Sequence, residues 1–326
     1  MARIKYGQIG VGHAHARKIS VYRRSDEFEV VGVVEPDPEL RRRAESSSAY
    51  NGLKWMTQQQ LLNMPGLQVV GCETRVRDLL DTAETCLNVG LHIHLDKPAG
   101  ESLPQFKRIL DTAAKKHLLL QMGYMYRYNP AVVLMREFLQ KGWLGEPFEV
   151  HTVMSKVVSA ASRSGLNDYP GGIMFELGCH IIDLVIGVLG KPVEVIAHRQ
   201  HASQIGDTLL DNMLAVLTYP QALATVKSSA MEVEGGARRH FVVCGSEGTF
   251  HFQPLDRPDV RVALSTDRGK YKKGYQDVPF GPYQRYVADA ADMAKIIRGE
   301  KDADFSYEHD LTVQETILKA SGLSTA

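Results

Sequence analysis

Short apolar runs alternate with amphipathic segments from the N-terminus to Met122. The apolar runs predict strands at Ile4–Ile9, Phe28–Val34, Leu67–Cys72, Leu91–Leu95 and Leu118–Met122. The amphipathic segments between them predict helices at about 13–24, 38–48, 57–64, 77–89 and 102–116. This alternation is typical of a doubly wound parallel sheet with helices on both faces, the architecture of dinucleotide-binding domains.

The pattern changes after Met122, where strands begin to follow one another with little helix between them. We expect a helix at 129–141, a strand at 146–157, a Ser-, Gly- and Asn-rich loop at 159–172 and a helix at 172–189. The next strands are predicted at 192–200, 208–219, 222–231, 238–244, 248–253 and 259–264, before helices at about 282–298 and 308–321. Consecutive strands without crossover helices favour a largely antiparallel sheet. The sequence therefore predicts an α/β Rossmann domain at 1–123 and an open, mainly antiparallel sheet domain at 124–326.

The composition narrows the class of protein. Lys plus Arg and Asp plus Glu each count 38, so the chain lacks the basic excess that nucleic-acid surfaces usually show. The four cysteines lie far apart without a C-x-x-C pair, which argues against a disulfide scaffold or zinc knuckle. The longest apolar run, Ile181–Leu189, is too short for a membrane span of roughly 20 residues. With no apolar leader at the N-terminus, we expect a cytoplasmic protein.

A glycine-rich turn follows the first predicted strand. Gly10 permits the tight turn, and Gly12 lets the backbone approach a pyrophosphate at the start of a helix. His15 occupies the place of the third glycine in G-x-G-x-x-G, and Glu35 ends the second strand. An acid at this spacing binds a ribose 2′-hydroxyl and repels a 2′-phosphate, which favours NAD over NADP.

Two alternatives to this interpretation stay open. Arg41 and Arg42 weaken the preference for NAD if they reach the same pocket. The turn is also compatible with an incidental strand–helix junction. His13, beside His15, is predicted to contact the cofactor because it lies where a nicotinamide or phosphate would reach.

Lys97 and His180 are the candidate catalytic side chains. Lys97 ends a predicted strand, before Pro98, and is suited to donate a hydrogen bond to a reacting oxygen. Histidine has an ordinary pKa of about 6.5, near working pH, so His180 is suited to accept a proton from a hydroxyl group. Glu176 at i−4 and Asp183 at i+3 share its helix face, where either one fixes the tautomer or stabilises the imidazolium. The structural alternatives are an exposed loop lysine and a half-buried histidine that bridges a helix face.

These motifs together resemble the Gfo/Idh/MocA family (glucose-fructose oxidoreductase, inositol dehydrogenase and rhizopine catabolism) over nearly the whole length. The resemblance is carried by Gly10-x-Gly12, Thr74, Asp96-Lys97-Pro98, the segment Gly123–Pro130 and the helix from Gly171-Gly172 to Asp183. It implies an NAD(P)-dependent enzyme that acts on a sugar, polyol or related compound. It also implies a homodimer or homotetramer and cofactor contacts at Thr74 and Lys97. The catalytic group would be Lys97, Glu176 and His180, which also bind the substrate.

The chain departs from the family pattern at several positions. Glu176 stands where the family has aspartate, which puts the role of that carboxylate in doubt. Arg75 and Val76 replace the proline and asparagine after the threonine, so the cofactor contact there is expected to differ. Lys18 stands where the family often has a histidine.

Further candidates have a functional and a structural interpretation. Arg127 either holds the structure together or contacts substrate, and Asp168 either binds substrate hydroxyls or is an ordinary turn residue. We expect no metal. The strand His92-x-His94-x-Asp96 is predicted to be buried on both faces, and the pair Glu176 and His180 lacks an evident third ligand.

Three functions therefore remain as hypotheses. The first is an NAD-dependent dehydrogenase that acts on CH–OH groups of a sugar or inositol-like polyol. The second is an enzyme with tightly bound, internally recycled NAD that hydrolyses glycosides or interconverts sugars. The third is a non-catalytic sensor of NAD and sugar.

Overall fold

The computed structural model describes residues 2–166 and 169–326, and the chain forms two compact units. The first unit contains residues 2–125, 285–307 and 326, and the second contains 126–284 and 308–325. The sequence placed residues 285–307 with the second domain, whereas the structure places them with the first unit.

The first unit is built on a six-stranded sheet in the order β3-β2-β1-β4-β5-β6. Its strands are β1 (Ile4–Ile9), β2 (Phe28–Val34), β3 (Trp55–Met56), β4 (Leu67–Cys72), β5 (His92–Leu95) and β6 (Leu120–Met122). All neighbouring pairs are parallel. This is the classic doubly wound order, in which the chain reverses direction across the sheet between β1 and β4. The predicted Rossmann fold is thereby confirmed.

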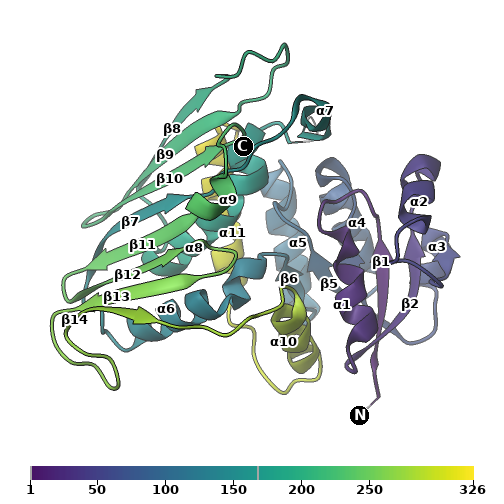
Figure 1. Cartoon of the computed structure of the whole chain (residues 1–326). Helices are drawn as coiled ribbons and strands as arrows, with labels where there is room; N and C mark the ends of the chain where they lie inside the picture. The colour runs from purple at the N-terminus through teal and green to yellow at the C-terminus, as the bar shows by residue number, and fades with distance from the viewer. Residues whose placement is uncertain (1, 167–168) are drawn as a thin grey trace. The chain divides into compact units, whose positions relative to one another are not determined.

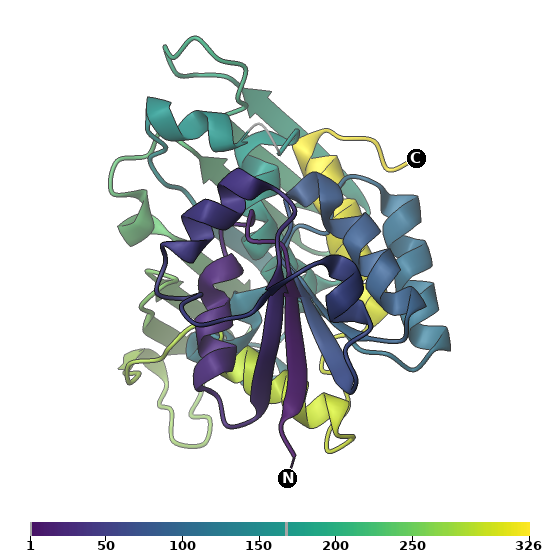
Figure 2. The same ribbon diagram turned by 90° about the vertical axis from the view of Figure 1, so that its right-hand side faces the viewer.

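Helices cover both sides of these strands (Figure 2). They are α1 (Ile19–Arg24), α2 (Pro38–Glu45), α3 (Gln58–Leu62), α4 (Leu79–Asn88), α5 (Leu103–Lys115) and α10 (Val287–Ile297), with 3₁₀ turns η1 (Ala16–Lys18) and η2 (Val76–Asp78). The helix predicted at 13–24 is wrong at its start. The His13 N–H bonds to the Glu73 carbonyl at 3.0 Å, so the chain stays in a turn until η1.

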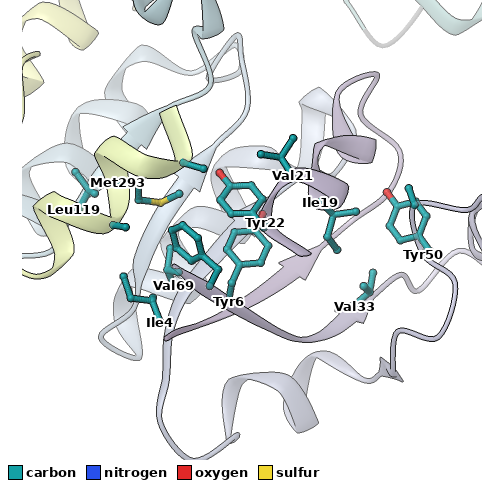
Figure 3. Close-up of a cluster of buried hydrophobic side chains, with 14 of the residues drawn as sticks. Ile4, Tyr6, Ile19, Val21, Tyr22, Val33, Tyr50, Val69, Leu119 and Met293 are labelled. Carbon is teal, nitrogen blue, oxygen red and sulfur yellow. The ribbon is translucent and has the colours of Figure 1, made fainter. Parts of the chain in front are cut away.

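An apolar cluster between sheet and helices explains why residues 285–307 belong to the first unit. Tyr6 and Val69 of the central strands pack with Tyr22 of α1, and Met293 of α10 joins the same cluster (Figure 3). Met293 and Ala294 are 0% exposed. Full burial of a methionine side chain stabilises the fold by about 1.5–3 kcal/mol, so packing holds α10 to the first unit.

The second unit is built on an eight-stranded sheet in the order β14-β13-β12-β11-β7-β10-β9-β8. Its strands are β7 (Pro147–Val153), β8 (Glu194–Gln200), β9 (Asn212–Thr218), β10 (Leu223–Ser229), β11 (His240–Gly245), β12 (Gly248–Gln253), β13 (Asp259–Leu264) and β14 (Gly274–Val278). Every pair is antiparallel except β7 with β10. The predicted, mainly antiparallel sheet is confirmed, and β14 was missed.

One face of this sheet carries the core of the second unit. Inward side chains such as Val150, Val226 and Phe250 are fully buried, while their neighbours along each strand face outward. The helices of the unit are α6 (Pro130–Gln140), α7 (Ala160–Arg163), α8 (Cys179–Leu189), α9 (Gly235–Arg238) and α11 (Tyr307–Ser321), with 3₁₀ turns η3 (Met125–Tyr128) and η4 (Ser164–Leu166). Of these, α6, α8 and α11 lie along one side of the sheet (Figure 1), and α8 packs directly on β7 and β10.

The helix predicted at 172–189 has two parts. A π-helix, η5 (Met174–Gly178), leads into α8. Single π-helical turns are rare and occur often at functional sites. The loop predicted at 159–172 contains α7 and η4, and the strand predicted to reach 157 ends at Val153. Among the described residues, the structure has no helix long and apolar enough to span a bilayer.

Candidate functional site

The carboxyl ends of three parallel strands bring the cofactor motifs of the first unit together. The Glu73 N–H after β4 bonds to the Ile9 carbonyl at 2.8 Å, and the Asp96 N–H after β5 bonds to the Cys72 carbonyl at 3.3 Å. Gly10, Thr74 and Lys97 therefore follow neighbouring strands at the topological switch point. This edge is where ligands bind in open α/β sheets.

Gly10 and Gly12 are required by close contacts within the protein. Gly10 has a positive φ of 92°, and a Cβ there would lie 2.4 Å from the Thr74 nitrogen. A Cβ on Gly12 would approach the Arg75 side chain to 3.1 Å. The tight turn expected at Gly10 is therefore present, and its backbone lies directly against the segment after β4.

A pocket of about 200 Å³ opens beside this turn. Its lining comes from the ends of β1, β2 and β4 and from the neighbouring helices: Ile9, Glu35, Pro36, Asp37, Leu40, Gln58, Thr74, Arg75, Asp78 and Thr82. The Thr74 Oγ1 is buried, and no described residue gives it a hydrogen-bond partner. An unsatisfied hydroxyl beside a glycine turn is suited to bind a polar ligand.

Glu35 is fixed at the mouth of the glycine turn. Its carboxylate accepts hydrogen bonds from the Val11 N–H at 2.8 Å and the Asp37 N–H at 2.9 Å. Each carboxylate oxygen has two lone pairs, so Glu35 keeps capacity for a ribose hydroxyl. The acid predicted at this spacing thus lies in the pocket that the turn borders.

The arginines near this pocket are already engaged. The Arg41 guanidinium lies 5.3 Å from the centre of the Trp55 ring and bonds to Glu45 at 2.9 Å. Arg75 pairs with Asp37 at 3.2 Å. The positive charges of these arginines, which would favour binding of a 2′-phosphate, are therefore partly balanced by neighbouring carboxylates.

A buried polar cluster surrounds Asp96. One carboxylate oxygen accepts from the Lys97 N–H at 2.7 Å and contacts His15 Nδ1 at 3.2 Å. The other binds the Lys18 ammonium at 2.8 Å and contacts His13 Nδ1 at 3.0 Å. Both carboxylate oxygens of Asp96 are thus in contact with protein nitrogens.

The charges in this cluster shift one another. Lys18 also binds Glu73 at 2.8 Å. Burial alone lowers the pKa of Lys18, but Asp96 and Glu73 outweigh this effect and raise it above its ordinary value. Burial and the nearby Asp96 raise the pKa of Glu73 well above its usual range. Burial also acts to raise the pKa of Asp96, but the opposing effects of His13, Lys18 and His15 are larger and hold that pKa well below its usual range. The arrangement therefore favours a charged pair of Lys18 and Asp96, and Glu73 is the more readily protonated of the two carboxylates that face Lys18.

His13, His15 and Asp96 have the composition of a metal site, since their ligand atoms lie within 4.8 Å of one another. However, the Lys18 ammonium already contacts the same carboxylate at 2.8 Å. A second cation there would meet like-charge repulsion in a low-dielectric environment. The cluster is better described as a hydrogen-bonded ion network.

Lys97 is held in place through its backbone. Its N–H donates to Asp96, and its carbonyl oxygen lies 3.0 Å from His13 Nε2. The side chain is 2% exposed. The alternative of an exposed loop lysine is thus excluded. His13, expected to contact the cofactor, directs both ring nitrogens at protein atoms.

Glu176 and His180 lie in the second unit, on η5 and α8. Glu176 Oε2 accepts a hydrogen bond from the Lys156 ammonium at 2.8 Å. The Tyr126 ring meets the His180 imidazole edge to face, with centroids 5.1 Å apart. His180 is 2% exposed and Glu176 is 7% exposed. The structure thus adds Lys156 and Tyr126 to the residues around the predicted pair.

Arg127 is the centre of a buried ion network in the second unit. Its guanidinium donates to Asp183 at 2.6, 3.0 and 3.1 Å and to Asp310 at 2.6 Å. Asp183 also contacts His309 at 3.2 Å. These contacts favour the structural interpretation of Arg127 over substrate binding. They also direct Asp183 to Arg127 and His309, whereas the sequence suggested that it supports His180.

Burial and pairing act in opposite directions on this network. Burial favours a higher pKa for Asp183, but Arg127 and His309 lower it below its ordinary value. Burial raises the pKa of Asp310, which accepts a hydrogen bond from Arg127 at 2.6 Å. Asp183, which has more hydrogen-bond partners and a lowered pKa, is thus the more strongly ionised of the two carboxylates.

Three residues that lie near the candidate site were given no role in the sequence analysis. Lys18, Glu73 and Lys156 form ion pairs with partners 20 or more positions away, and no local pattern signals such pairs. The one local hint was Lys156 itself, a charged residue near the end of the strand predicted at 146–157. The predicted substrate residue Asp168 lies outside the described residues.

Two family models match the chain. One, described as an oxidoreductase family with an NAD-binding Rossmann fold, covers residues 4–124. The other, the C-terminal domain of the GFO/IDH/MocA proteins, covers residues 132–251. The two matches fall on the two sheets described above.

Curated relatives are distant. An oxidoreductase of Schizosaccharomyces pombe is 21% identical over 231 residues, 68% of this chain and 63% of that protein. The inositol 2-dehydrogenase of Salmonella typhimurium is 24% identical over 275 residues, 81% of this chain and 79% of that protein. The chain spans 48% to 63% of the length of four matched oxidoreductases from Schizosaccharomyces pombe and Escherichia coli.

Solved structures share the fold. UDP-N-acetylglucosamine 3-dehydrogenase GnnA from Acidithiobacillus ferrooxidans superposes with a TM-score of 0.81 at 18% identity, covering 100% of this chain and 99% of that chain. GenD2 from gentamicin A biosynthesis, in complex with NAD, gives a TM-score of 0.79 at 18% identity and covers 99% and 95%. At such identities the likeness establishes the architecture alone.

Proposed function

We propose that this chain, which belongs to the Gfo/Idh/MocA family of NAD-binding oxidoreductases, is a dehydrogenase. Its substrate would be a sugar, an inositol-like polyol or a related compound. The reaction would move a hydride between the nicotinamide and a carbon that carries a hydroxyl or keto oxygen. One relative is named inositol 2-dehydrogenase and another levoglucosan dehydrogenase, which supports this substrate class.

The observation that carries the proposal is the setting of Lys97. This lysine follows β5 at the same sheet edge as the Gly10 turn, is 2% exposed, and has both its N–H and its carbonyl oxygen engaged. Its placement beside a nucleotide motif supports a role in catalysis.

The residues of the first unit fit a dinucleotide. Gly10 and Gly12 would lie under the pyrophosphate, Glu35 would accept a hydrogen bond from a ribose hydroxyl, and the buried Thr74 hydroxyl would gain a partner. When bound, the nicotinamide supplies the hydride acceptor. Glu35 and Asp37 both line the adjoining pocket, and their negative charge supports NAD over NADP.

The catalytic roles follow from the chemistry of the side chains. Lys97 would donate a hydrogen bond to the reacting oxygen and stabilise negative charge that develops there. His180 would accept the hydroxyl proton as the general base. Glu176, bound to Lys156 at 2.8 Å, would bind substrate hydroxyls next to His180. We also propose that the protein assembles as a homodimer or homotetramer.

Steady-state assays with NAD and NADP test this function on a panel of sugars, inositols and other polyols. We expect NADH formation with at least one compound, faster than NADPH formation, and a fall in kcat of at least 100-fold in Lys97→Met. Lys107→Met is the matched control, because Lys107 pairs with Asp111 on the exposed surface of the same unit. It should keep wild-type kcat.

Other outcomes would replace the proposal. Full turnover by Lys97→Met would remove Lys97 from the mechanism. Product without free NADH would favour internally recycled NAD. Binding of NAD and a sugar without turnover of any compound in the panel would favour a sensor.

A further inference from the structure

We propose that His13, directly, and Lys18, through Asp96, are positioning residues that hold the backbone of Lys97, and so the direction of its side chain, for catalysis. This inference rests on the proposed function, since it assigns Lys97 to the reacting oxygen. Neither His13 nor Lys18 would contact the substrate in this role.

The first step is that hydrogen bonds restrain the Lys97 backbone on both sides of its Cα. The peptide group before Lys97 is bound through its N–H to Asp96 Oδ1 at 2.7 Å. The peptide group after it is bound through its carbonyl oxygen to His13 Nε2 at 3.0 Å. Both torsions at the Lys97 Cα are therefore restrained, which sets the direction in which its side chain leaves the backbone.

The second step is the restraint on Asp96. Lys18 donates to Asp96 Oδ2 at 2.8 Å and reaches Glu73, after β4, at 2.8 Å. His13 contacts the same oxygen at 3.0 Å. Asp96 is thereby bound from the glycine turn by His13 and from η1 by Lys18, and Lys18 is itself bound to Glu73 at the neighbouring strand end. A carboxylate with this many partners has no freedom to rotate.

The third step is the orientation of His13. Its Nε2 lies on a carbonyl oxygen, which only accepts, so Nε2 carries a hydrogen. The His15 N–H lies 3.2 Å from His13 Nδ1, and Asp96 Oδ2 lies 3.0 Å from it. The ring is therefore held from both ends. It connects the glycine turn directly to the Lys97 backbone.

Stability alone does not account for this network. Buried ion pairs can often be replaced by apolar residues of similar volume without loss of stability. Lys18, Glu73 and Asp96 are 3%, 0% and 0% exposed. Precise placement gives a reason to keep them, because a displacement of about 1 Å in an active site can cost 100-fold in rate.

The test compares two substitutions at one position. His13→Gln keeps an N–H that can donate to the Lys97 carbonyl, whereas His13→Leu removes it. We expect His13→Leu to lower kcat by 10- to 100-fold with less than a threefold change in substrate KM and in the Kd for NAD. His13→Gln should recover at least a third of wild-type kcat. Lys18→Met should resemble His13→Leu, since it releases Asp96.

A stability control separates positioning from folding. His92 begins β5, the strand that ends before Lys97, and its Nδ1 accepts from the Leu119 N–H at 2.9 Å. His92→Leu should lower the melting temperature and leave kcat unchanged. Wild-type kcat in His13→Leu, or an equal loss in His13→Gln and His13→Leu, would overturn the inference.

A readout without turnover keeps the inference testable if no substrate is found. We expect the Lys97 amine to react with trinitrobenzenesulfonate at least five times faster in His13→Leu than in wild type or His13→Gln, as followed by peptide mass spectrometry. Equal rates in all three proteins would reject positioning by His13. Failure of the proposed function appears instead as a wild-type protein that turns over nothing.

Discussion

Arg127 connects two carboxylates that burial would otherwise make costly. Asp183 and Asp310 are 2% and 3% exposed, and each lies 2.6 Å from the guanidinium. The fork of Arg127 engages Asp183 through two nitrogens, a geometry that lysine lacks. This network joins η3, α8 and α11 within the second unit.

Removal of Arg127 is expected to be severe. Arg127→Leu should lower the free energy of unfolding by about 3–5 kcal/mol, because it leaves uncompensated buried carboxylates. Urea denaturation measures the change. Arg43→Leu is the control: Arg43 pairs with Glu39 on an exposed helix face, where such pairs contribute about 0–1 kcal/mol. A loss below 1 kcal/mol in Arg127→Leu would contradict this role.

At the scale of elements, a glycine pair sets the entry of the helix that carries Glu176 and His180. Gly172 has a φ of +63°, and a Cβ there would lie 2.5 Å from the Leu210 carbonyl oxygen. A Cβ on Gly171 would lie 2.6 Å from the Phe175 Cβ. Larger residues would push the π-helix away from its neighbours. The Gly-Gly entry therefore has a packing reason.

Two alanine substitutions in this segment should change the free energy of unfolding in opposite directions. Gly172→Ala should lower the free energy of unfolding by more than about 1 kcal/mol, since alanine does not favour this backbone conformation. Gly187→Ala, inside α8 with open space around it, should raise it by about 0.5–1 kcal/mol. Thermal and urea denaturation measure both. Equal effects would show that the strain and contacts at Gly172 are unimportant.

At the scale of the whole molecule, proton binding is linked to unfolding. Burial lowers the pKa of His15 from 6.5 to about 4, against the opposing effect of Asp96. Between these values the unfolded chain takes up a proton that the folded chain does not. The stabilisation is therefore complete above pH 6.5 and is lost as the pH falls towards 4.

The magnitude follows from the width of this interval. His15 should contribute up to about 3 kcal/mol of lost stability between pH 6.5 and pH 4. Urea denaturation at several pH values would measure it, with His15→Gln as the comparison because glutamine does not titrate. The two proteins should differ in slope below pH 6.5. Parallel curves would contradict the shifted pKa of His15.

Local pattern was sufficient for most elements of both sheets. The strands β1, β2 and β4 lie where they were predicted, because most of their apolar residues are buried in the sheet. β14 was missed because its five residues, GYQDV, are mostly polar and none is buried. The helix start at 13 was wrong because contacts with the segment after β4 hold His13 in a turn.

The amino-acid sequence determined the two sheets, the glycine turn and the positions of Lys97, Glu176 and His180, because these depend on local periodicity and short motifs. Only the tertiary structure decided the partners of the buried charges. It paired Lys18 with Asp96 and Glu73, Arg127 with Asp183 and Asp310, and Lys156 with Glu176. It also placed residues 285–307 with the first unit. A buried charge must find an opposite charge or a hydrogen-bond partner, and which one it finds depends on how distant segments pack.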